Sequence, residues 1–268
     1  MIIDAHVHIG TSLGLIFPPQ LVLESMDKYN IDYALVSNLD GSEVDFDQNL
    51  IPDEYRQSQI DINKKAIEFA KECPDKIGAL LWGMPLMESC DEEFEKLLAE
   101  NLDVVRGIKI HPYHNKTRFD DPKVQEYLKL AAKYDVAVMT HTANDECSDC
   151  RQVYEMAKKY PGVRFVMAHA QLGSEDNSEA IECLKEGLPN LYADCAWVRP
   201  ENALRIIKEC GADKLLFGSD NPIDGLDTYA HPEFYGIYFN EFKNMVTEEE
   251  YTKLMKDNAI KVYKLNLQ

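Results

Sequence analysis

Positively charged residues are scarce in this chain of 268 residues. Lys and Arg together number 28, whereas Asp and Glu number 47, which gives a formal net charge of −19 at pH 7. Nucleic-acid binding starts from a cationic surface, and anionic membranes attract basic segments. The charge balance therefore argues against both kinds of partner, although net charge says little about the chemistry of an individual pocket.

Long hydrophobic runs and an even set of cysteines are also lacking. A membrane-spanning helix needs about 20 predominantly apolar residues, and the uncharged stretch 5–23 contains two histidines and Pro18-Pro19. Residues 1–4 have neither the basic nor the apolar region of a secretory leader. The seven cysteines are spread along the chain, unlike a compact disulfide framework. We therefore expect a cytoplasmic protein without a membrane segment.

No repeat, low-complexity tract or Ser/Pro-rich linker divides the chain, so we expect one domain over residues 1–268. An apolar fraction of 45% is enough for a large core. Eight short apolar runs recur, each followed by a segment with helical periodicity, and the expected strands are 2–8, 33–37, 77–82, 105–111, 136–141, 164–169, 191–195 and 215–219. Eight units of roughly 25–30 residues predict an α/β fold of the (β/α)8 TIM-barrel type.

The alternative fold is an open doubly wound sheet, whose usual G-x-G-x-x-G after the first strand is missing here. Two connections are long, 40–61 after the second strand and 221–245 after the eighth. Loops at the C-terminal ends of barrel strands build active sites, so we expect both to be lid-like insertions. Helix starts are marked by Asp121-Pro122 and by the capping-box spacing of residues 247–250.

Histidines and one aspartate fall at the ends of the expected strands. His6 and His8 lie two apart in the first run, so their side chains share one face of a strand. His141 ends the fifth run, His169 ends the sixth, and Asp220 directly follows the eighth. The C-terminal ends of parallel barrel strands meet on one rim, so these groups should converge there. Imidazole nitrogens with one carboxylate suit a first-row divalent metal that keeps an open position for water.

The same segments resemble a known family. The matching motifs are 4–8 (DAHVH), 107–112 (GIKIHP), 139–141 (MTH), 167–169 (MAH) and 218–222 (GSDNP). They look like the amidohydrolase superfamily, and are most similar to the amidohydrolase-related branch that includes aminocarboxymuconate-semialdehyde decarboxylase and predicted TIM-barrel hydrolases. Residues 257–263 also match the closing helix of this branch, so the resemblance spans nearly the whole chain.

The resemblance implies roles for the strand-end residues. His6, His8, His141 and Asp220 would hold one divalent ion, zinc in preference to manganese, and His169 would lie close to the bound water or substrate. Family members often form dimers through loops on the barrel rim, which implies a homodimer by analogy. The partners implied are a small-molecule substrate and a second copy of the chain.

The residues themselves are compatible with these roles. An open metal site lowers the pKa of water toward about 7, Asp220 can accept or orient a proton, and His169 can act as general acid–base. The reaction expected first is hydrolysis of a lactone, ester or amide, and the alternative is non-oxidative decarboxylation of an unsaturated or aromatic acid. The shortness of the chain favours hydrolysis. A non-catalytic barrel is a third possibility, against which the intact ligand set argues.

Three basic residues are candidates for binding a substrate carboxylate. Lys109 and His111 lie two apart in the fourth run, and Arg199 follows the seventh. For Lys109 two alternatives stay open: an ion pair with Asp4 or another buried acid, and carboxylation with a bridged second metal. For Arg199 the alternative is a solvated ion pair on the surface.

Several other motifs carry weaker signals. Residues 10–14 match G-x-S-x-G, but two prolines and a loop follow, so a nucleophile elbow is not expected. Cys147 and Cys150 form a lone C-x-x-C, which we interpret as ordinary thiols, with a substrate-loop or redox role as the alternative. Aromatic side chains that could wall a planar substrate are Trp82, Trp197, Tyr229, Phe234 and Tyr235.

Overall fold

Eight parallel strands pair in chain order in the computed structural model, which describes residues 1–267. The strands are β1 (Ile3–Ile9), β2 (Tyr33–Asn38), β3 (Ile77–Trp82), β4 (Val105–Ile110), β5 (Ala137–Ala143), β6 (Phe165–Leu172), β7 (Leu191–Asp194) and β8 (Leu215–Leu216). Each lies within a few residues of its expected range. Strand β8 is short, because regular pairing with β7 ends at Leu216.

The sheet closes between the segment after β8 and β1. The Ala5 amide donates to the Phe217 carbonyl at 2.9 Å, the Asp220 amide to the His6 carbonyl at 2.8 Å, and the His8 amide to the Asn221 carbonyl at 2.8 Å. These bonds join β1 to the segment that continues β8, and the predicted (β/α)8 fold is confirmed.

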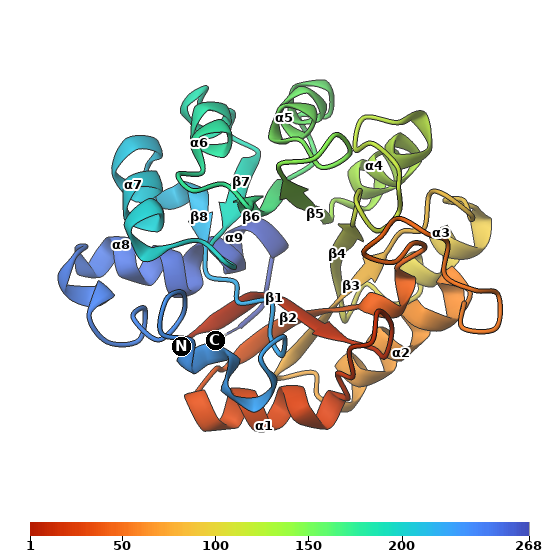
Figure 1. Cartoon of the computed structure of the whole chain (residues 1–268), viewed down its shortest axis with the longest axis horizontal. Coiled ribbons are helices and arrows are strands. Elements are labelled where there is room, and N and C mark those ends of the chain that lie inside the picture. Colours follow the sequence, from red (N-terminus) through yellow and green to blue (C-terminus); the bar gives the residue numbers. More distant parts are fainter. Residues whose placement is uncertain (268) are drawn as a thin grey trace.

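Helices form an outer ring around the strands (Figure 1). The helices are α1 (Pro19–Tyr29), α2 (Gln59–Glu72), α3 (Glu92–Ala99), α4 (Pro122–Tyr134), α5 (Cys150–Lys159), α6 (Ser178–Lys185), α7 (Pro200–Cys210), α8 (Glu248–Thr252) and α9 (Asn258–Tyr263). Both expected helix starts are confirmed. Asp121 caps α4 through the Lys123 amide, and Thr247 and Glu250 form a reciprocal capping box at α8. A wider helical turn, Lys253–Asp257, makes α8 and α9 continuous.

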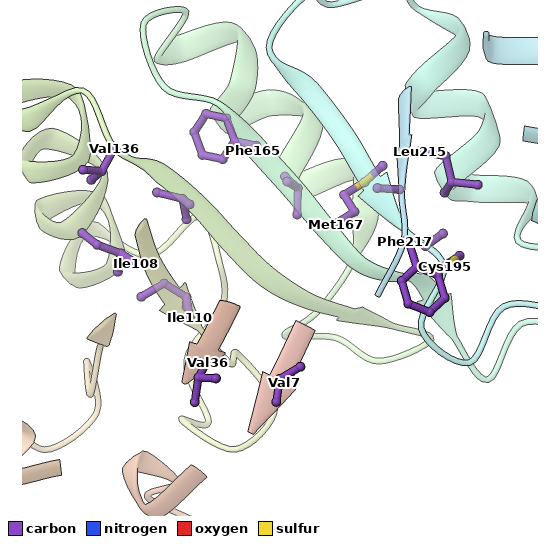
Figure 2. Close-up of a cluster of buried hydrophobic side chains, with 14 of the residues drawn as sticks. Val7, Val36, Ile108, Ile110, Val136, Phe165, Met167, Cys195, Leu215 and Phe217 are labelled. Atoms are coloured by element: carbon purple, nitrogen blue, oxygen red, sulfur yellow. The ribbon is translucent and has the colours of Figure 1, made fainter. Parts of the chain in front are cut away.

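Apolar side chains form two layers on opposite faces of the strands. The outer layer packs strands against helices, and Figure 2 shows part of it, with Val7 and Val36 on the neighbouring strands β1 and β2. The inner layer fills the start of the barrel with Ile3, Tyr33, Leu35, Leu80, Ala137, Met139, Val166, Ala168 and Leu216, together with residues of α9. This plug leaves polar side chains to occupy the other end of the interior.

The loops at the C-terminal ends of the strands follow the expected pattern. Residues 10–17 form a loop closed by paired backbone bonds between Gly10 and Phe17, so the G-x-S-x-G serine is not on a nucleophile elbow. Residues from the two long connections, Ser42 and Phe46 from the first and Ile223 from the second, line a pocket above the strand ends. None of the helices within residues 1–267 is long and apolar enough to span a membrane.

Candidate metal centre and active site

Two histidines of β1 point into the barrel because the strand contains an extra residue. Between Asp4 and Val7 the pairing with β2 shifts, so that three steps along β1 match two steps along β2. An extra residue of this kind is a β-bulge, and it changes the face that the following side chains take. Val7 consequently packs in the outer layer, whereas His6 and His8 project into the pocket.

The His6 ring is held by a carboxylate at the end of β7. Its Nδ1 lies 2.9 Å from Asp194 Oδ2, and because the carboxylate can only accept, Nδ1 carries the proton. The unprotonated Nε2 lies 3.1 Å from His8 Nε2 and 3.6 Å from Asp220 Oδ1. Burial lowers the pKa of both imidazoles, so both rings are neutral at pH 7.

Asp220 presents its two carboxylate oxygens in different directions. Oδ1 lies 2.9 Å from His8 Nε2, and Oδ2 accepts a hydrogen bond of 2.9 Å from the indole N–H of Trp197. The residue has a left-handed backbone with φ of +61°, an uncommon conformation outside glycine that concentrates at functional sites. Burial raises the pKa of the carboxyl, but the His8 bond and the nearby histidines outweigh it and hold the pKa well below its usual range.

His169 joins the group from β6 through an irregular stretch of backbone. Residues 169–171 all have positive φ, and the pairing of β6 with β5 shifts at this point. The His169 Nδ1 donates to the Ala196 carbonyl at 3.2 Å, which leaves Nε2 unprotonated. Burial lowers the pKa of His169 to about 4. The ring is therefore a neutral base or ligand at pH 7.

The arrangement suits a metal ion. The ligand atoms of His6, His8 and Asp220 lie within 4.8 Å of one another, and so do those of His6, His169 and Asp194. Two imidazole nitrogens and a carboxylate oxygen are donors that first-row divalent ions accept, and a carboxylate behind a ligating histidine is a recurrent feature of such sites. The donor set therefore fits a divalent cation.

His141, the fourth predicted ligand, lies beside this group rather than within it. Its ring is 4.8 Å from the His169 ring and stacks on His111 at 4.0 Å. Its Nδ1 is buried, and among residues 1–267 it has no hydrogen-bond partner. A buried imidazole nitrogen without a partner is costly unless something else binds it. This nitrogen is consistent with a ligand role for His141.

Lys109 reaches the same centre from β4. Its side chain is fully buried, and its Nζ lies 2.9 Å from His6 Nε2. Burial lowers the pKa of Lys109 to about 8. The alternative of a lysine tied to a buried acid does not apply to Asp4, whose Oδ2 accepts bonds from the hydroxyls of Ser219 and Tyr229. The buried acids whose charge acts on Lys109 are Asp194 and Asp220. Lys109 therefore lies behind the histidines, on the inner side of the site.

His111 forms part of a stack of rings along the pocket wall. It lies between Trp82 and His141. The ring centroids of His111 and Trp82 are 5.6 Å apart with an interplanar angle of 17°, and those of His111 and His141 are 4.0 Å apart with an angle of 14°. Burial lowers the pKa of His111 well below its usual value, so the expectation of a cationic group at this position is wrong. The side chain offers a neutral planar surface instead.

The pocket above these residues has a volume of about 150 Å³. Six of the seven histidines line it together with Asp220 and Ser42, and its other walls are Leu13, Leu15, Phe17, Leu39, Phe46, Trp82, Leu172 and Ile223. No Arg or Lys of the described chain is among the lining residues. Arg199 is exposed and lines a neighbouring hollow with Trp197 and Phe234, so its expected place in the site is not what the structure shows.

The structure adds residues that sequence reasoning missed. Asp194 also accepts the backbone N–H groups of His169 and Ala196, at 2.8 and 3.1 Å, and so holds two strand-end histidines at once. His114 enters the pocket from the loop after β4, with its Nδ1 donating to the Val44 carbonyl at 3.0 Å. For Asp194 the sequence did offer a signal, an acidic residue at the end of the seventh apolar run. For His114, which lies four residues beyond the end of β4, the sequence offered no signal of a place in the site.

The C-x-x-C pair shows no sign of a redox site. Cys147 and Cys150 are free thiols, and burial raises the pKa of both, well above the usual value for Cys150. A raised thiol pKa disfavours the reactive thiolate. The structure supports the interpretation of two ordinary thiols.

The fold and the possible metal-binding side chains at the strand ends point to a metal-dependent barrel enzyme. The sequence model of the amidohydrolase family matches residues 3–265, and the chain belongs to this family. Its members are metal-dependent enzymes that act on small molecules. The search of curated proteins gave no match.

Solved structures with the same fold have different activities. A putative amidohydrolase from Staphylococcus aureus is 16% identical, with a TM-score of 0.68, over 98% of this chain and 99% of that one. 5-Carboxyvanillate decarboxylase from Novosphingobium aromaticivorans, complexed with manganese, is 13% identical, with a TM-score of 0.72, over 99% and 96%. A probable 2-pyrone-4,6-dicarboxylic acid hydrolase from Acinetobacter baumannii is 15% identical, with a TM-score of 0.66, over 98% and 99%. At these identities the likeness concerns the fold and does not choose between the reactions.

Proposed function

We propose that the protein is a metal-dependent hydrolase that acts on a small molecule, which can carry a carboxylate, by way of an activated water. The observation that carries the proposal is the convergence of the His6, His8 and Asp220 ligand atoms at the base of a pocket. These three residues and His141 would hold one divalent ion, with zinc as the first candidate and manganese as the second. When bound, the ion supplies Lewis acidity that lowers the pKa of water toward about 7.

The protein side chains supply orientation and proton transfer. His169 has an unprotonated Nε2 at pH 7 and is the candidate general base. Asp220, the second catalytic candidate, would orient the water rather than take its proton, because its neighbours hold the pKa of its carboxyl well below the usual range. Asp194 fixes the tautomer of His6 and the backbone of His169. Apolar side chains make up much of the pocket wall, and most of the pocket histidines are buried, which strengthens electrostatic interactions among them.

The second candidate function is non-oxidative decarboxylation of an unsaturated or aromatic acid. The stack of Trp82, His111 and His141 along the pocket wall favours a planar substrate. The decarboxylases among the structural neighbours share the fold, as do hydrolases. Neither observation selects the bond that is broken.

Two measurements test these functions. Elemental analysis of the purified protein, with and without added zinc or manganese, should give one divalent ion per chain. A panel of lactones, esters and amides should then be compared with a panel of aromatic and muconate-type acids assayed for CO₂ release. Turnover in the first panel supports the hydrolase, and CO₂ release in the second supports the decarboxylase. A protein that binds no ion under any of these conditions would refute both.

The homodimeric state and the cytoplasmic location remain predictions from sequence. Sedimentation of the metal-loaded protein tests the first, with a mass near twice the 30.6 kDa of one chain expected. Fractionation of cells that express the protein tests the second.

A further inference from the structure

Trp197 lies between the proposed metal centre and the second insertion, outside the substrate pocket. Its indole Nε1–H donates to Asp220 Oδ2 at 2.9 Å, and its backbone N–H donates to the Tyr235 hydroxyl at 2.9 Å. Tyr235 belongs to the 221–245 connection and is fully buried. Trp197 therefore contacts one carboxylate oxygen of the centre and one residue of the insertion at the same time.

The backbone of Trp197 is held in a conformation that a bulky residue rarely adopts. Its φ is +58°, in the left-handed region that favours glycine. Such a conformation persists only when the surroundings fix it. The rings of Phe234, Tyr235 and His231 pack edge-on around the indole at centroid distances of 5.0, 6.0 and 5.6 Å. These contacts aim the indole N–H at Asp220.

We propose that Trp197 is a positioning residue for Asp220, an inference that rests on the metal-dependent function proposed above. The indole N–H holds Oδ2 and leaves Oδ1, which lies 2.9 Å from His8 Nε2, as the oxygen that would bind an ion. A hydrogen bond to the outer oxygen of a ligating carboxylate fixes its orientation and its mode of coordination. The aromatic cluster of the insertion keeps this bond in place.

The contact itself can be tested without metal. The chain has two tryptophans, Trp82 and Trp197, so ¹⁵N-labelled tryptophan gives two indole N–H resonances in the metal-free protein. Trp82 Nε1 is buried without a hydrogen-bond partner in the described chain, and it serves as the internal reference. We expect the Trp197 proton to lie downfield of the Trp82 proton and to move upfield in Asp220→Asn. A Trp197 resonance that does not respond to Asp220→Asn would overturn the proposal.

The effect on the metal is tested with two variants of the same cluster. Trp197→Phe removes the N–H donor and keeps an aromatic ring, whereas Phe234→Leu removes aromatic packing on the indole and keeps the donor. We expect Trp197→Phe to weaken Mn²⁺ binding about tenfold and to change the electron paramagnetic resonance spectrum of the bound ion. Phe234→Leu removes one of the three rings around the indole but keeps the N–H donor and the Tyr235 hydroxyl, so it should weaken Mn²⁺ binding clearly less than Trp197→Phe does. Circular dichroism and thermal unfolding verify that both variants are folded.

The outcomes separate the two proposals. If Trp197→Phe binds Mn²⁺ as the unchanged protein does, or if Phe234→Leu weakens binding equally, Trp197 does not position Asp220 through its N–H. If the unchanged protein binds no Mn²⁺ or Zn²⁺, the metal-dependent function fails. The indole resonances would then still show whether Trp197 holds the Asp220 carboxylate.

Discussion

The barrel interior has two halves of opposite character on the same strands. At the strand starts, side chains such as Leu35, Leu80 and Val166 form an apolar plug with α9. At the strand ends, the interior holds histidines, an aspartate and a fully buried lysine around a pocket. Hydrophobic burial in the first half stabilises the folded protein. The second half buries polar groups, which cost free energy unless they have hydrogen-bond partners. The difference indicates that the strand starts support the fold and the strand ends carry the chemistry.

The largest expected effect comes from removing the two β1 histidines from the polar half of the interior. The double variant His6→Ala/His8→Ala removes two ligand atoms, so metal content should fall below about one tenth of an ion per chain. Catalytic efficiency should fall roughly 10³-fold, because several kcal/mol of electrostatic stabilisation are lost. Elemental analysis and kinetics on the identified substrate measure both. Leu102→Ala is the control, since Leu102 is exposed and does not line the pocket, and it should retain full metal content. A double variant with unchanged metal content would refute the site.

The apolar half should respond in stability instead. Leu80→Ala opens a cavity beside the other plug residues and should cost about 3 kcal/mol of unfolding free energy. Urea unfolding of the metal-free protein measures this, with Leu102→Ala as the control. Leu102 is 40% exposed, so its loss should cost less than about 0.5 kcal/mol. Both variants should keep the metal content of the unchanged protein. Loss of metal from a folded Leu80→Ala protein would show that the two halves are not separable.

A buried carboxyl group at the rim of the polar half, that of Glu43, should make the unfolding free energy depend on pH. The carboxylate of Glu43 accepts bonds from the amides of Leu86 and Met87 and from Asn115, and burial raises the pKa of Glu43 to about 7. The folded pKa lies above the unfolded value, so the folded state binds the extra proton between about pH 4.5 and 7. Unfolding free energy should therefore fall as pH rises through this window, by about 3 kcal/mol from this group.

The matched measurement is urea unfolding at pH 5 and pH 8. Glu43→Gln cannot ionise, so the part of the slope that belongs to Glu43 should disappear in this variant. Equal pH dependence in the two proteins would mean that Glu43 does not titrate in this range.

The fold was predictable because its signals are local. Apolar runs, helix caps at Asp121 and Thr247, and the spacing between strands each depend on nearby residues. The shared face of His6 and His8 also follows from the strand period. The choice of the inner face depends on the bulge between Asp4 and Val7, which is defined by pairing with β2 and leaves no mark in the sequence of β1 alone.

The remaining parts of the site depend on tertiary contacts. Arg199 matches the type and position expected of a carboxylate clamp, but it directly precedes α7 and is exposed outside the pocket. We expected a charged His111 from the sequence. The expectation failed because the packing of its ring against Trp82 and His141 is not visible in the sequence. The orientation of the Trp197 side chain depends on a left-handed backbone conformation, which the neighbouring sequence does not predict.

Asp194 lies at the boundary between the two halves and gives the smallest expected effect. It is the last residue of β7, fully buried, and it accepts one bond from the His6 ring and two from backbone amides. In Asp194→Asn an amide donor would face at least one of these donors, so the His6 ring should lose its fixed tautomer while the apolar plug stays intact. We expect metal affinity to fall about 10- to 100-fold. Competition with a chromophoric chelator measures this, and Asp213→Asn, at an exposed position, is the control. An unchanged affinity would place Asp194 with the scaffold half of the barrel rather than with the chemistry.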